Sequence, residues 1–465
     1  MISRAFINKS FASYLPLLII LAISAFMRFV KIWQFFQFDF DQQVPAEAAY
    51  DFFINHKLTL VGQELSFQGF FLGPLNNWIQ FIPYKLCNLL PDCIPYFYGL
   101  ISLATGPVLF IAAKKIFDSK TALIASAIYL ISVASISAQW NVNSNYFLFL
   151  SSVGLLFCAN QYLMGKKLYL ILGAFIAGLA TVNFNPVYLF STIAFFAASL
   201  TKSPRNYLVY LLASASFLIN YLPLAIFNFR HNNLLIDSLK NFAAQSADAQ
   251  NYFEKSIFLL KDVLIPFYVN FLFLDTAPVF IFLTVALLIM GITAAAKSKD
   301  KILLFLLLWI ITAFLGFVFY RGHIPDYYFL QTSLPFILLI ALALRKNFLV
   351  FLIVTTLFLY MNISRVIYAQ SSSNYRVKKQ AVDYVIDDSG NRSFNVYYDM
   401  PFGLNTGYSY LFKVLGKNPQ EGGENLYILE LISPSQFELV KYLKAFKDKQ
   451  IFVKVIGFIH LIVIK

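Results

Sequence analysis

The sequence is poor in charge, in cysteine and in histidine. Only 13% of its 465 residues are Asp, Glu, Lys or Arg, whereas 59% are hydrophobic, and the mean hydropathy is +0.68. A soluble protein of this length rarely has such a composition, so the scarcity of charge argues against a soluble enzyme. The composition is typical of a polytopic α-helical membrane protein.

The three cysteines and four histidines do not form a visible metal-ligand cluster. Cys158 falls inside an apolar stretch and is expected to be a small core residue. Cys87 and Cys93 are separated by five intervening residues, Pro91 among them, in a segment expected to be extracytoplasmic, where a disulfide can persist. The sequence leaves open whether these two form a disulfide or remain free thiols, and whether a divalent metal is required.

Apolar stretches of about 15 to 21 residues, close to the ~20 residues that cross a bilayer, recur along the chain. There are eleven, at Ser13–Val30, Ile94–Ala113, Thr121–Ala138, Tyr146–Met164, Leu168–Val182, Pro186–Leu200, Tyr207–Phe227, Ala277–Ala296, Ile302–Tyr320, Tyr327–Leu344 and Phe348–Tyr368. The first resembles a signal peptide, but no small-residue cleavage pattern follows it, so we interpret it as an uncleaved span. We therefore predict about eleven transmembrane helices.

The basic residues orient this array. With the N-terminus in the cytoplasm, the short inner loops hold 14 of the 36 Lys and Arg residues and two of the 23 Asp and Glu residues. Nearly all of the net charge of +13 then lies on the cytoplasmic side, as the positive-inside rule requires. We predict a multi-pass protein of the plasma or inner membrane with an extracytoplasmic C-terminus. No basic face remains to bind nucleic acid.

The remaining chain divides into a membrane domain, residues 1–370, and a soluble extracytoplasmic α/β domain, residues 371–465. Outer loops are expected at 31–93 and 228–276. The first loop should carry two interfacial helices, Phe52–Leu60 and Trp78–Leu90. The C-terminal domain alternates short apolar patterns, which predict helices at Val377–Asp387, Tyr408–Leu415 and Gln436–Lys447 and strands at Phe394–Tyr398, Leu426–Leu431, Ile451–Ile456 and His460–Ile464. It has no Gly-rich phosphate loop or nucleophile elbow, so we expect it to cap the membrane domain or help admit an acceptor.

Two carboxylates, Asp39 and Asp41, directly follow the first apolar stretch. Acids beside lipid are costly unless they are solvated, paired or functional. A carboxylate at the outer membrane surface is suited to act as a general base or a metal ligand. The alternative is that both acids are merely solvated at the interface.

Four short motifs, in their order and spacing, resemble the GT-C superfamily of membrane glycosyltransferases, in the branch of bacterial protein O-mannosyltransferases and aminoarabinose transferases. The motifs are Asp41-Gln42-Gln43-Val44-Pro45, Gly73-Pro74-Leu75-Asn76-Asn77, Trp140-Asn141-Val142-Asn143 and Phe227-Asn228-Phe229-Arg230-His231. The resemblance covers roughly residues 10–370. The chain departs from the family where members carry Arg-Asp in the first motif, so a second acid would have to be Glu47 or Asp51, or be absent. It also carries Asn183-Phe184-Asn185 where relatives often have Gln-x-His.

The resemblance implies a sugar donor linked to a polyprenyl phosphate and an acceptor at the extracytoplasmic face. The acceptor hydroxyl or amine must lose a proton, so Asp41 is the preferred general base and Asp39 the second candidate. The leaving phosphate needs cationic groups, for which the candidates are Arg230, His231, Arg321 and His323. Supporting residues are expected to be Arg28, Gln42, Glu47, Asn141, Asn183 and Tyr328. Arg28 is an alternative partner for Asp39 or Asp41.

Each basic pair has a simpler explanation, because it ends an apolar span and could anchor to lipid headgroups. Asn183 and Asn185 could hydrogen-bond a sugar, but we favour capping of the broken helix ends. Two other classes of function also fit a polytopic chain. A transporter or flippase of lipid-linked saccharides would keep ionisable residues near the middle of its spans, whereas here they gather at the outer ends. A polymerase or ligase of such saccharides usually lacks a soluble C-terminal domain. The sequence therefore favours a hexosyl- or pentosyltransferase, with a glycolipid, polysaccharide or protein as acceptor.

Overall fold

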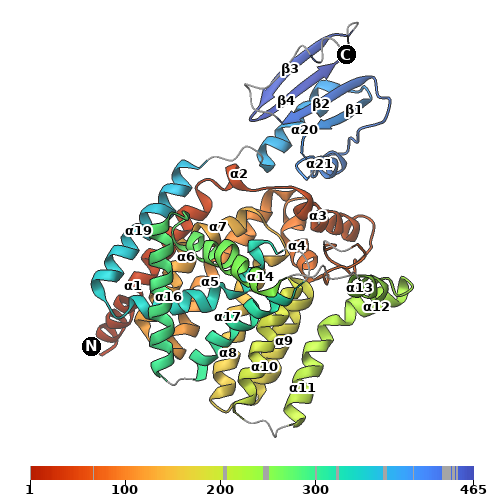
Figure 1. Cartoon of the computed structure of the whole chain (residues 1–465). Helices are drawn as coiled ribbons and strands as arrows, with labels where there is room; N and C mark the ends of the chain where they lie inside the picture. Colours follow the sequence, from red (N-terminus) through yellow and green to blue (C-terminus); the bar gives the residue numbers. More distant parts are fainter. Residues whose placement is uncertain are drawn as a thin grey trace.

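The described part of the chain is a bundle of apolar helices with a small sheet at one end (Figure 1). It is a computed structural model that describes residues 2–65, 68–202, 207–244, 251–298, 301–320, 324–369, 374–401, 403–431, 441, 446 and 449–465. The helices of the bundle are α1 (Ile2–Phe29), α5 (Ile94–Ile116), α6 (Ser119–Ile131), α7 (Val133–Trp140), α8 (Leu148–Leu163), α9 (Leu168–Asn183), α10 (Leu189–Leu200), α11 (Tyr207–Leu218), α12 (Leu222–Arg230), α15 (Ile265–Leu272), α16 (Pro278–Ser298), α17 (Lys301–Phe319), α18 (Ser333–Leu344) and α19 (Phe348–Tyr368). Short turns adjoin them at η1 (Pro91–Cys93), η2 (Ser144–Phe147), η3 (Pro186–Tyr188), η4 (Ile219–Tyr221), η5 (Leu259–Leu264) and η6 (Asp326–Thr332).

Fewer helices are long enough to cross a membrane than the sequence predicts. Within the described residues, seven helices are long and apolar enough to span a bilayer, and the bent pair α6–α7 is an eighth. The other predicted spans form shorter apolar helices, Tyr14–Phe29, Leu168–Asn183 and Pro186–Leu200. The chain is therefore a polytopic helical membrane protein, but the count of eleven crossings is not confirmed.

Helix α18 occupies the centre of the bundle. All twelve of its residues are buried, so no part of it faces lipid. Neighbouring α16 approaches it closely at Gly291, where an added Cβ would lie 2.3 Å from the carbonyl oxygen of Leu339. Such close packing makes α18 a rigid support for η6, which precedes it directly.

A break between α6 and α7 turns the chain by 45°. The buried side chain of Asn362, on α19, satisfies the backbone there. Its Oδ1 accepts the amide of Val133 at 2.8 Å, and its Nδ2 donates to the carbonyls of Leu272 at 2.8 Å and Phe358 at 2.9 Å. In an apolar surrounding each of these groups would otherwise be unpaired, so Asn362 fixes the direction of α7.

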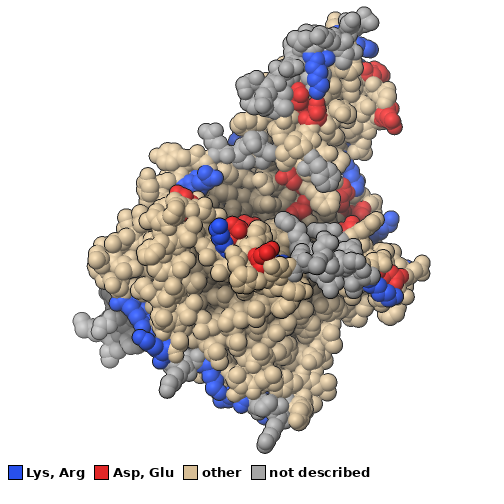
Figure 2. All heavy atoms as spheres, viewed as in Figure 1, with Lys and Arg blue, Asp and Glu red and all other residues tan. Residues whose placement is uncertain are grey.

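Basic residues gather at the end of the bundle opposite the sheet. Figure 2 shows Lys and Arg along this rim, whereas Asp and Glu appear only on the other parts of the face shown. The loops at this end contact one another, since Lys120 donates to the carbonyl of Arg345 at 2.9 Å and Lys301 to that of Thr201 at 3.3 Å. The loops predicted to be cytoplasmic therefore share one end of the molecule.

The first outer segment folds into α2 (Ile32–Phe35), α3 (Phe40–Phe53) and α4 (Leu75–Leu86). The helix predicted at Phe52–Leu60 is wrong, because the helix begins at Phe40, immediately after the acidic run, and ends at Phe53. The apolar pattern alone did not register the helix cap at Asp39. The second outer segment forms α13 (Leu234–Ala244), α14 (Tyr252–Phe258), η5 and α15. Cys87 and Cys93 form a disulfide.

The chain after α19 forms what we call the C-terminal unit, residues 374–465. It contains α20 (Tyr375–Ser389), β1 (Phe394–Asp399), α21 (Tyr408–Val414), β2 (Asn425–Leu431), β3 (Ile451–Ile456) and β4 (Ile459–Ile464). The strand order is β1-β2-β4-β3, with β1 and β2 parallel and the other pairs antiparallel. The four predicted strands and two of the predicted helices are present. The helix predicted at Gln436–Lys447 lies outside the described residues, apart from Lys441 and Phe446.

Replacing Asn362 should destabilise the bundle. In Asn362→Leu, the amide of Val133 loses its acceptor in a buried site, which costs about 1–3 kcal/mol. We expect a lower apparent melting temperature in detergent than for the wild type. The control is Tyr360→Leu on the same helix, where the side chain is 71% exposed and little change is expected. Equal melting temperatures for the two variants would contradict this role of Asn362.

Candidate active site

A cavity of about 940 Å³ lies between the first outer segment, α7 and η6. Its polar residues come from segments far apart in the sequence and include Asp41, Asn141, Asn145, Asn185 and Tyr328. Its apolar residues, many of them aromatic, come from several elements, including α2, α7, α8, α10, α15 and η6. A large, mostly apolar cavity with a few convergent polar groups is the usual form of a small-molecule site.

Helix α3 carries Asp41 into this cavity. The helix starts with a capping box, in which the Asp39 side chain accepts the backbone N–H of Gln42 and the Gln42 side chain accepts that of Asp39. The amide of Gln42 also donates to Asn141 Oδ1 and to the carbonyl of Val142, both at 2.8 Å. Gln42 therefore ties the first turn of α3 to the segment after α7, and the next residue on the N-terminal side, Asp41, faces the cavity.

The surroundings of Asp41 favour its protonated form. Burial raises the pKa of this carboxyl above its usual value, a hydrogen bond from the Gln63 amide lowers it in part, and the negative charge of Asp39 raises it further. A carboxylate with a raised pKa in a cavity is a stronger proton acceptor than an exposed aspartate. This combination is typical of a general base.

Two further acids line the cavity, Glu64 and Asp326, and the sequence reasoning missed both. Glu64 accepts the backbone N–H of Gly69 at 2.6 Å. Their signal in the sequence is weak, because Glu64 lies in a loop without a motif and Asp326 begins the short helix η6, and neither stands in one of the four motifs. The described residues contain no group of three or more His, Cys, Asp or Glu placed to hold a metal ion.

The structure places Asp39 outside the cavity lining. Its carboxylate forms an ion pair with Lys378 of α20. Glu47, a candidate for the second acid, pairs with Lys413 of α21 at 2.6 Å. Asp51, the other candidate, accepts a hydrogen bond from Asn55 at 2.8 Å. The contacts of these three acids are structural, which leaves Asp41 as the acid of the motif that reaches the cavity.

The predicted ion pair between Arg28 and the acidic run is not formed. Arg28 is fully buried at the end of α1, where its Nη2 donates to Ser135 Oγ at 3.0 Å and its Cζ lies 6.0 Å from the centre of the Tyr129 ring. Ser135 and Tyr129 both line the cavity. Nε and Nη1 of Arg28 have no hydrogen-bond partner, and no described carboxylate pairs with it. Arg28 is therefore a cation directly behind the cavity wall.

The other cationic candidates are not brought to the cavity within the described residues. Arg230 and His231 end α12 on an exposed surface, and the His231 ring stacks on Phe227 at 4.0 Å. Arg321 and His323 lie outside the described residues, although Tyr320, which precedes them, lines the cavity. Among the described lining residues none is Lys, Arg or His.

The supporting residues divide into two groups. Asn141 and Tyr328 line the cavity, as expected for ligand contacts. Asn183 does not line the cavity. Its Oδ1 accepts a hydrogen bond from the backbone N–H of Leu75 at 3.2 Å and so contacts the loop that carries Gly73. Asn185, two residues later, lines the cavity and donates to Asn145 Oδ1 at 2.6 Å. In the Asn183-Phe184-Asn185 motif, the second asparagine therefore faces the cavity.

Comparison with known proteins identifies the fold. No family model and no curated protein sequence matches the chain. Among solved structures it is similar to ArnT from Cupriavidus metallidurans in the apo state, with 12% identity, a TM-score of 0.65 and coverage of 96% of this chain and 97% of that one. The same ArnT bound to undecaprenyl phosphate aligns at 11% identity and a TM-score of 0.60, with the same coverage.

A more distant likeness extends to the Archaeoglobus fulgidus oligosaccharyltransferase tethered to an acceptor peptide. It has 13% identity and a TM-score of 0.51, and it covers 81% of this chain and 58% of that one. The chain therefore shares its fold with ArnT and, more distantly, with the oligosaccharyltransferase, which confirms the fold that the resemblance in the sequence implied.

Proposed function

We propose that this chain with an ArnT-like fold is a membrane glycosyltransferase that moves a sugar from a polyprenyl phosphate to an acceptor hydroxyl or amine. The observation that carries the proposal is the position of Asp41, a carboxylate with a raised pKa in the lining of a cavity of about 940 Å³. Support for a lipid phosphate donor comes from the ArnT structure that contains undecaprenyl phosphate. The sugar transferred is a hexose or a pentose, and the acceptor is a glycolipid, a polysaccharide or a protein.

The reaction follows from the groups in the cavity. The acceptor oxygen or nitrogen attacks the anomeric carbon while the bond from that carbon to the phosphate oxygen breaks. Asp41 removes the proton of the acceptor, and the lipid phosphate leaves with the electron pair. Gln63 holds the carboxylate of Asp41 through its hydrogen bond. Asn141, Asn145 and Tyr328 can hydrogen-bond the sugar hydroxyls from the cavity wall.

The phosphate needs a positive charge near it as it leaves. Arg28 supplies one from behind Ser135 and Tyr129, without a carboxylate to neutralise it among the described residues. A buried arginine stays protonated, so an anion in the cavity would relieve the cost of its burial. We assign Arg28 to the phosphate side of the site. Arg321 and His323 stay candidates because they follow Tyr320 in the chain.

We place the protein in the plasma or inner membrane, with the cavity and the C-terminal unit on the extracytoplasmic side. The rim of Lys and Arg at the opposite end supports this orientation through the positive-inside rule. Donors carried on polyprenyl phosphate reach the extracytoplasmic face after being flipped, so the proposed donor and orientation agree.

Removing the base should stop transfer. Asp41→Asn keeps the size of the side chain but cannot accept the proton, so we expect kcat to fall by about 10²- to 10⁴-fold. The assay is transfer of radiolabelled sugar from polyprenyl phosphate in membranes. Asp237→Asn is the control, because Asp237 is an exposed acid in an ion pair with Lys240 and should keep full activity. Full activity of Asp41→Asn would rule out Asp41 as the base.

The pH profile should report the same carboxyl. Because the pKa of Asp41 is raised by burial, the acid limb of kcat/KM should lie above the usual range of an exposed aspartate, with activity rising as the carboxylate forms. Gln63→Ala removes a hydrogen bond that favours the carboxylate, so this limb should move to still higher pH. A limb that stays in place, or moves to lower pH, would contradict the assigned contact.

Loss of the Arg28 charge should weaken phosphate binding. For Arg28→Met we expect roughly tenfold weaker binding of undecaprenyl phosphate, measured directly on purified protein, whereas Arg28→Lys should retain more affinity. Arg365→Met, an exposed arginine at the end of α19, is the matched control. Equal affinities of Arg28→Met and the control, at matched melting temperatures, would remove Arg28 from the phosphate side.

A further inference from the structure

The C-terminal unit contacts the beginning of α3 through a buried lysine. The side chain of Lys378, on α20, is only 2% exposed. Its Nζ donates to the carbonyls of Phe38 at 3.0 Å and Thr406 at 2.9 Å and forms an ion pair with Asp39. A buried ammonium group is costly unless its hydrogen bonds are satisfied, and here all three are. The cation is therefore fixed at one point, the cap of α3.

Two more contacts continue along the same helix. The backbone N–H of Gly407 donates to Gln43 Oε1 at 2.7 Å, and Lys413 pairs with Glu47 at 2.6 Å. With Asp39, these α3 partners are spaced four residues apart, so they form one stripe along the helix. Asp41 is two residues from both Asp39 and Gln43, which is about 200° around the helix axis. The C-terminal unit thus holds one face of α3 while the other presents Asp41 to the cavity.

The approach at Gly407 leaves little freedom. Its φ is +88°, and an added Cβ would lie 2.4 Å from the carbonyl oxygen of Phe38, the same oxygen that Lys378 contacts. A residue with a side chain would be strained there and would push α21 away from the acidic run. Gly407 and Lys378 therefore both contact Phe38, the residue that precedes Asp39.

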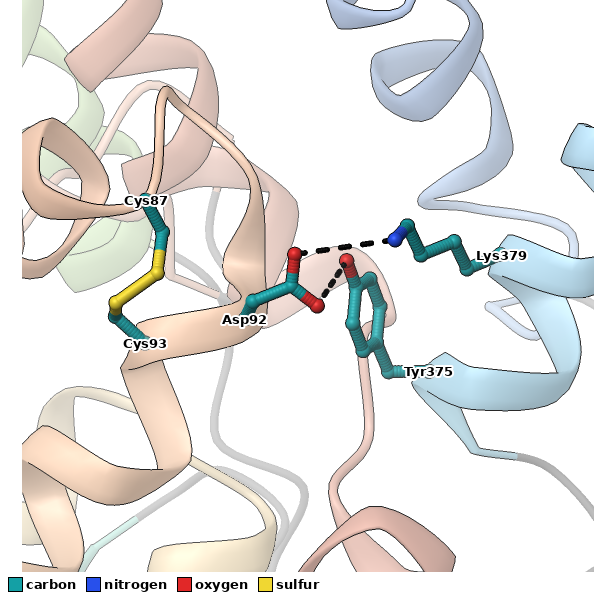
Figure 3. Close-up of a disulfide and its surroundings, with 5 residues drawn as sticks. All are labelled: Cys87, Asp92, Cys93, Tyr375 and Lys379. Atoms are coloured by element: carbon teal, nitrogen blue, oxygen red, sulfur yellow. Dashed lines mark hydrogen bonds and ion pairs between the residues drawn. A yellow bond between two sulfur atoms is a disulfide. The ribbon is translucent and has the colours of Figure 1, made fainter.

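A second anchor lies beside the first and does not involve α3. The backbone N–H of Tyr375 donates to the carbonyl of Phe36 at 2.8 Å, and its hydroxyl donates to Asp92 at 3.1 Å. Lys379 approaches Asp92 at 4.0 Å. Figure 3 shows Asp92 next to the Cys87–Cys93 disulfide, pointing toward both residues of α20. The neighbouring lysines Lys378 and Lys379 of α20 thus contact different parts of the first outer segment.

We propose that the C-terminal unit positions the reactive carboxylate, with Lys378 as the positioning residue that holds Asp39 and so sets the orientation of Asp41 in the cavity. This inference rests on the proposed function for the role of Asp41 in transfer. The simpler explanation, that these contacts only attach the unit to the bundle, would assign no special effect to the stripe on α3. Substitutions of Lys378 and Lys379, the two neighbouring lysines of α20, distinguish the two explanations, because only Lys378 contacts the cap of α3.

The experiment compares Lys378→Met with Lys379→Met in the full-length protein. Hydrogen–deuterium exchange of residues 40–53 reports the order of α3 without any assay of transfer. We expect faster exchange there in Lys378→Met and unchanged exchange in Lys379→Met, because Lys379 contacts Asp92 rather than α3. Exchange that is the same in the two variants would overturn the proposal. Because this readout needs no donor, an inactive wild type would refute the proposed function without deciding this test.

Kinetics give the second readout. Misplacing Asp41 should lower kcat of Lys378→Met on the order of 10- to 100-fold, while undecaprenyl phosphate binds as tightly as to wild type. A loss confined to donor binding, with kcat unchanged, would contradict a positioning role. Gln43→Ala, which removes only the contacts to Gly407 and Ser409, should cause a smaller change in the same direction. It keeps the test decisive if Lys378→Met does not fold.

A double variant that removes both charges tests whether the ion pair between Asp39 and Lys378 itself orders α3. Asp39→Asn alone leaves the buried ammonium without its counterion, yet asparagine still caps a helix. The double variant Asp39→Asn/Lys378→Met removes both charges. We expect its α3 exchange to be slower than in either single variant, because no unpaired charge remains. Additive effects of the two substitutions would show that Asp39 and Lys378 act separately, which would overturn the proposal.

Discussion

The placement of one outer helix, α3, governs the geometry of the cavity. A carboxylate in a cavity keeps a defined position only where the helix that carries it is held, and α3 is held from two sides. Gln42 ties it to the residues after α7, and Lys378 and Lys413 tie it to the C-terminal unit. Asp41 lies between these two sets of polar contacts. The raised pKa of its carboxyl follows from this enclosure, because burial is its largest cause.

Much of the fold could be predicted from the sequence because its signals are local. Apolar runs located the bundle helices, and alternating patterns located β1 to β4. The spans were harder to count, because a pattern does not say whether a short helix such as Leu168–Asn183 crosses the bilayer fully. The start of α3 was missed, since its cap at Asp39 is a matter of hydrogen bonds rather than of apolar periodicity.

The site was only partly predictable for a different reason. Asp41 was singled out because acids are rare in this chain, and Asn141 because it stands in one of the motifs; both line the cavity, and their roles stay predictions. The partners of the other acids depend on contacts between residues more than 300 positions apart, such as Asp39 with Lys378 and Glu47 with Lys413. Periodicity carries no information about such pairs. Arg28 likewise needed the fold, which sets it behind Ser135 rather than beside the acidic run.

The complete burial of α18 has a consequence for how the cavity can change shape. Tyr327 and Tyr328 stand on η6, which continues directly into a helix enclosed by others on all sides. The facing wall of the cavity is formed by α3. In the ion pair between Lys413 and Glu47 of this helix, both side chains are about one-third exposed to solvent. The two walls therefore differ in what holds them, because the η6 wall is anchored in the core of the bundle and the α3 wall is held by polar contacts to the C-terminal unit. A change of cavity shape on the α3 side would have to involve the C-terminal unit as well.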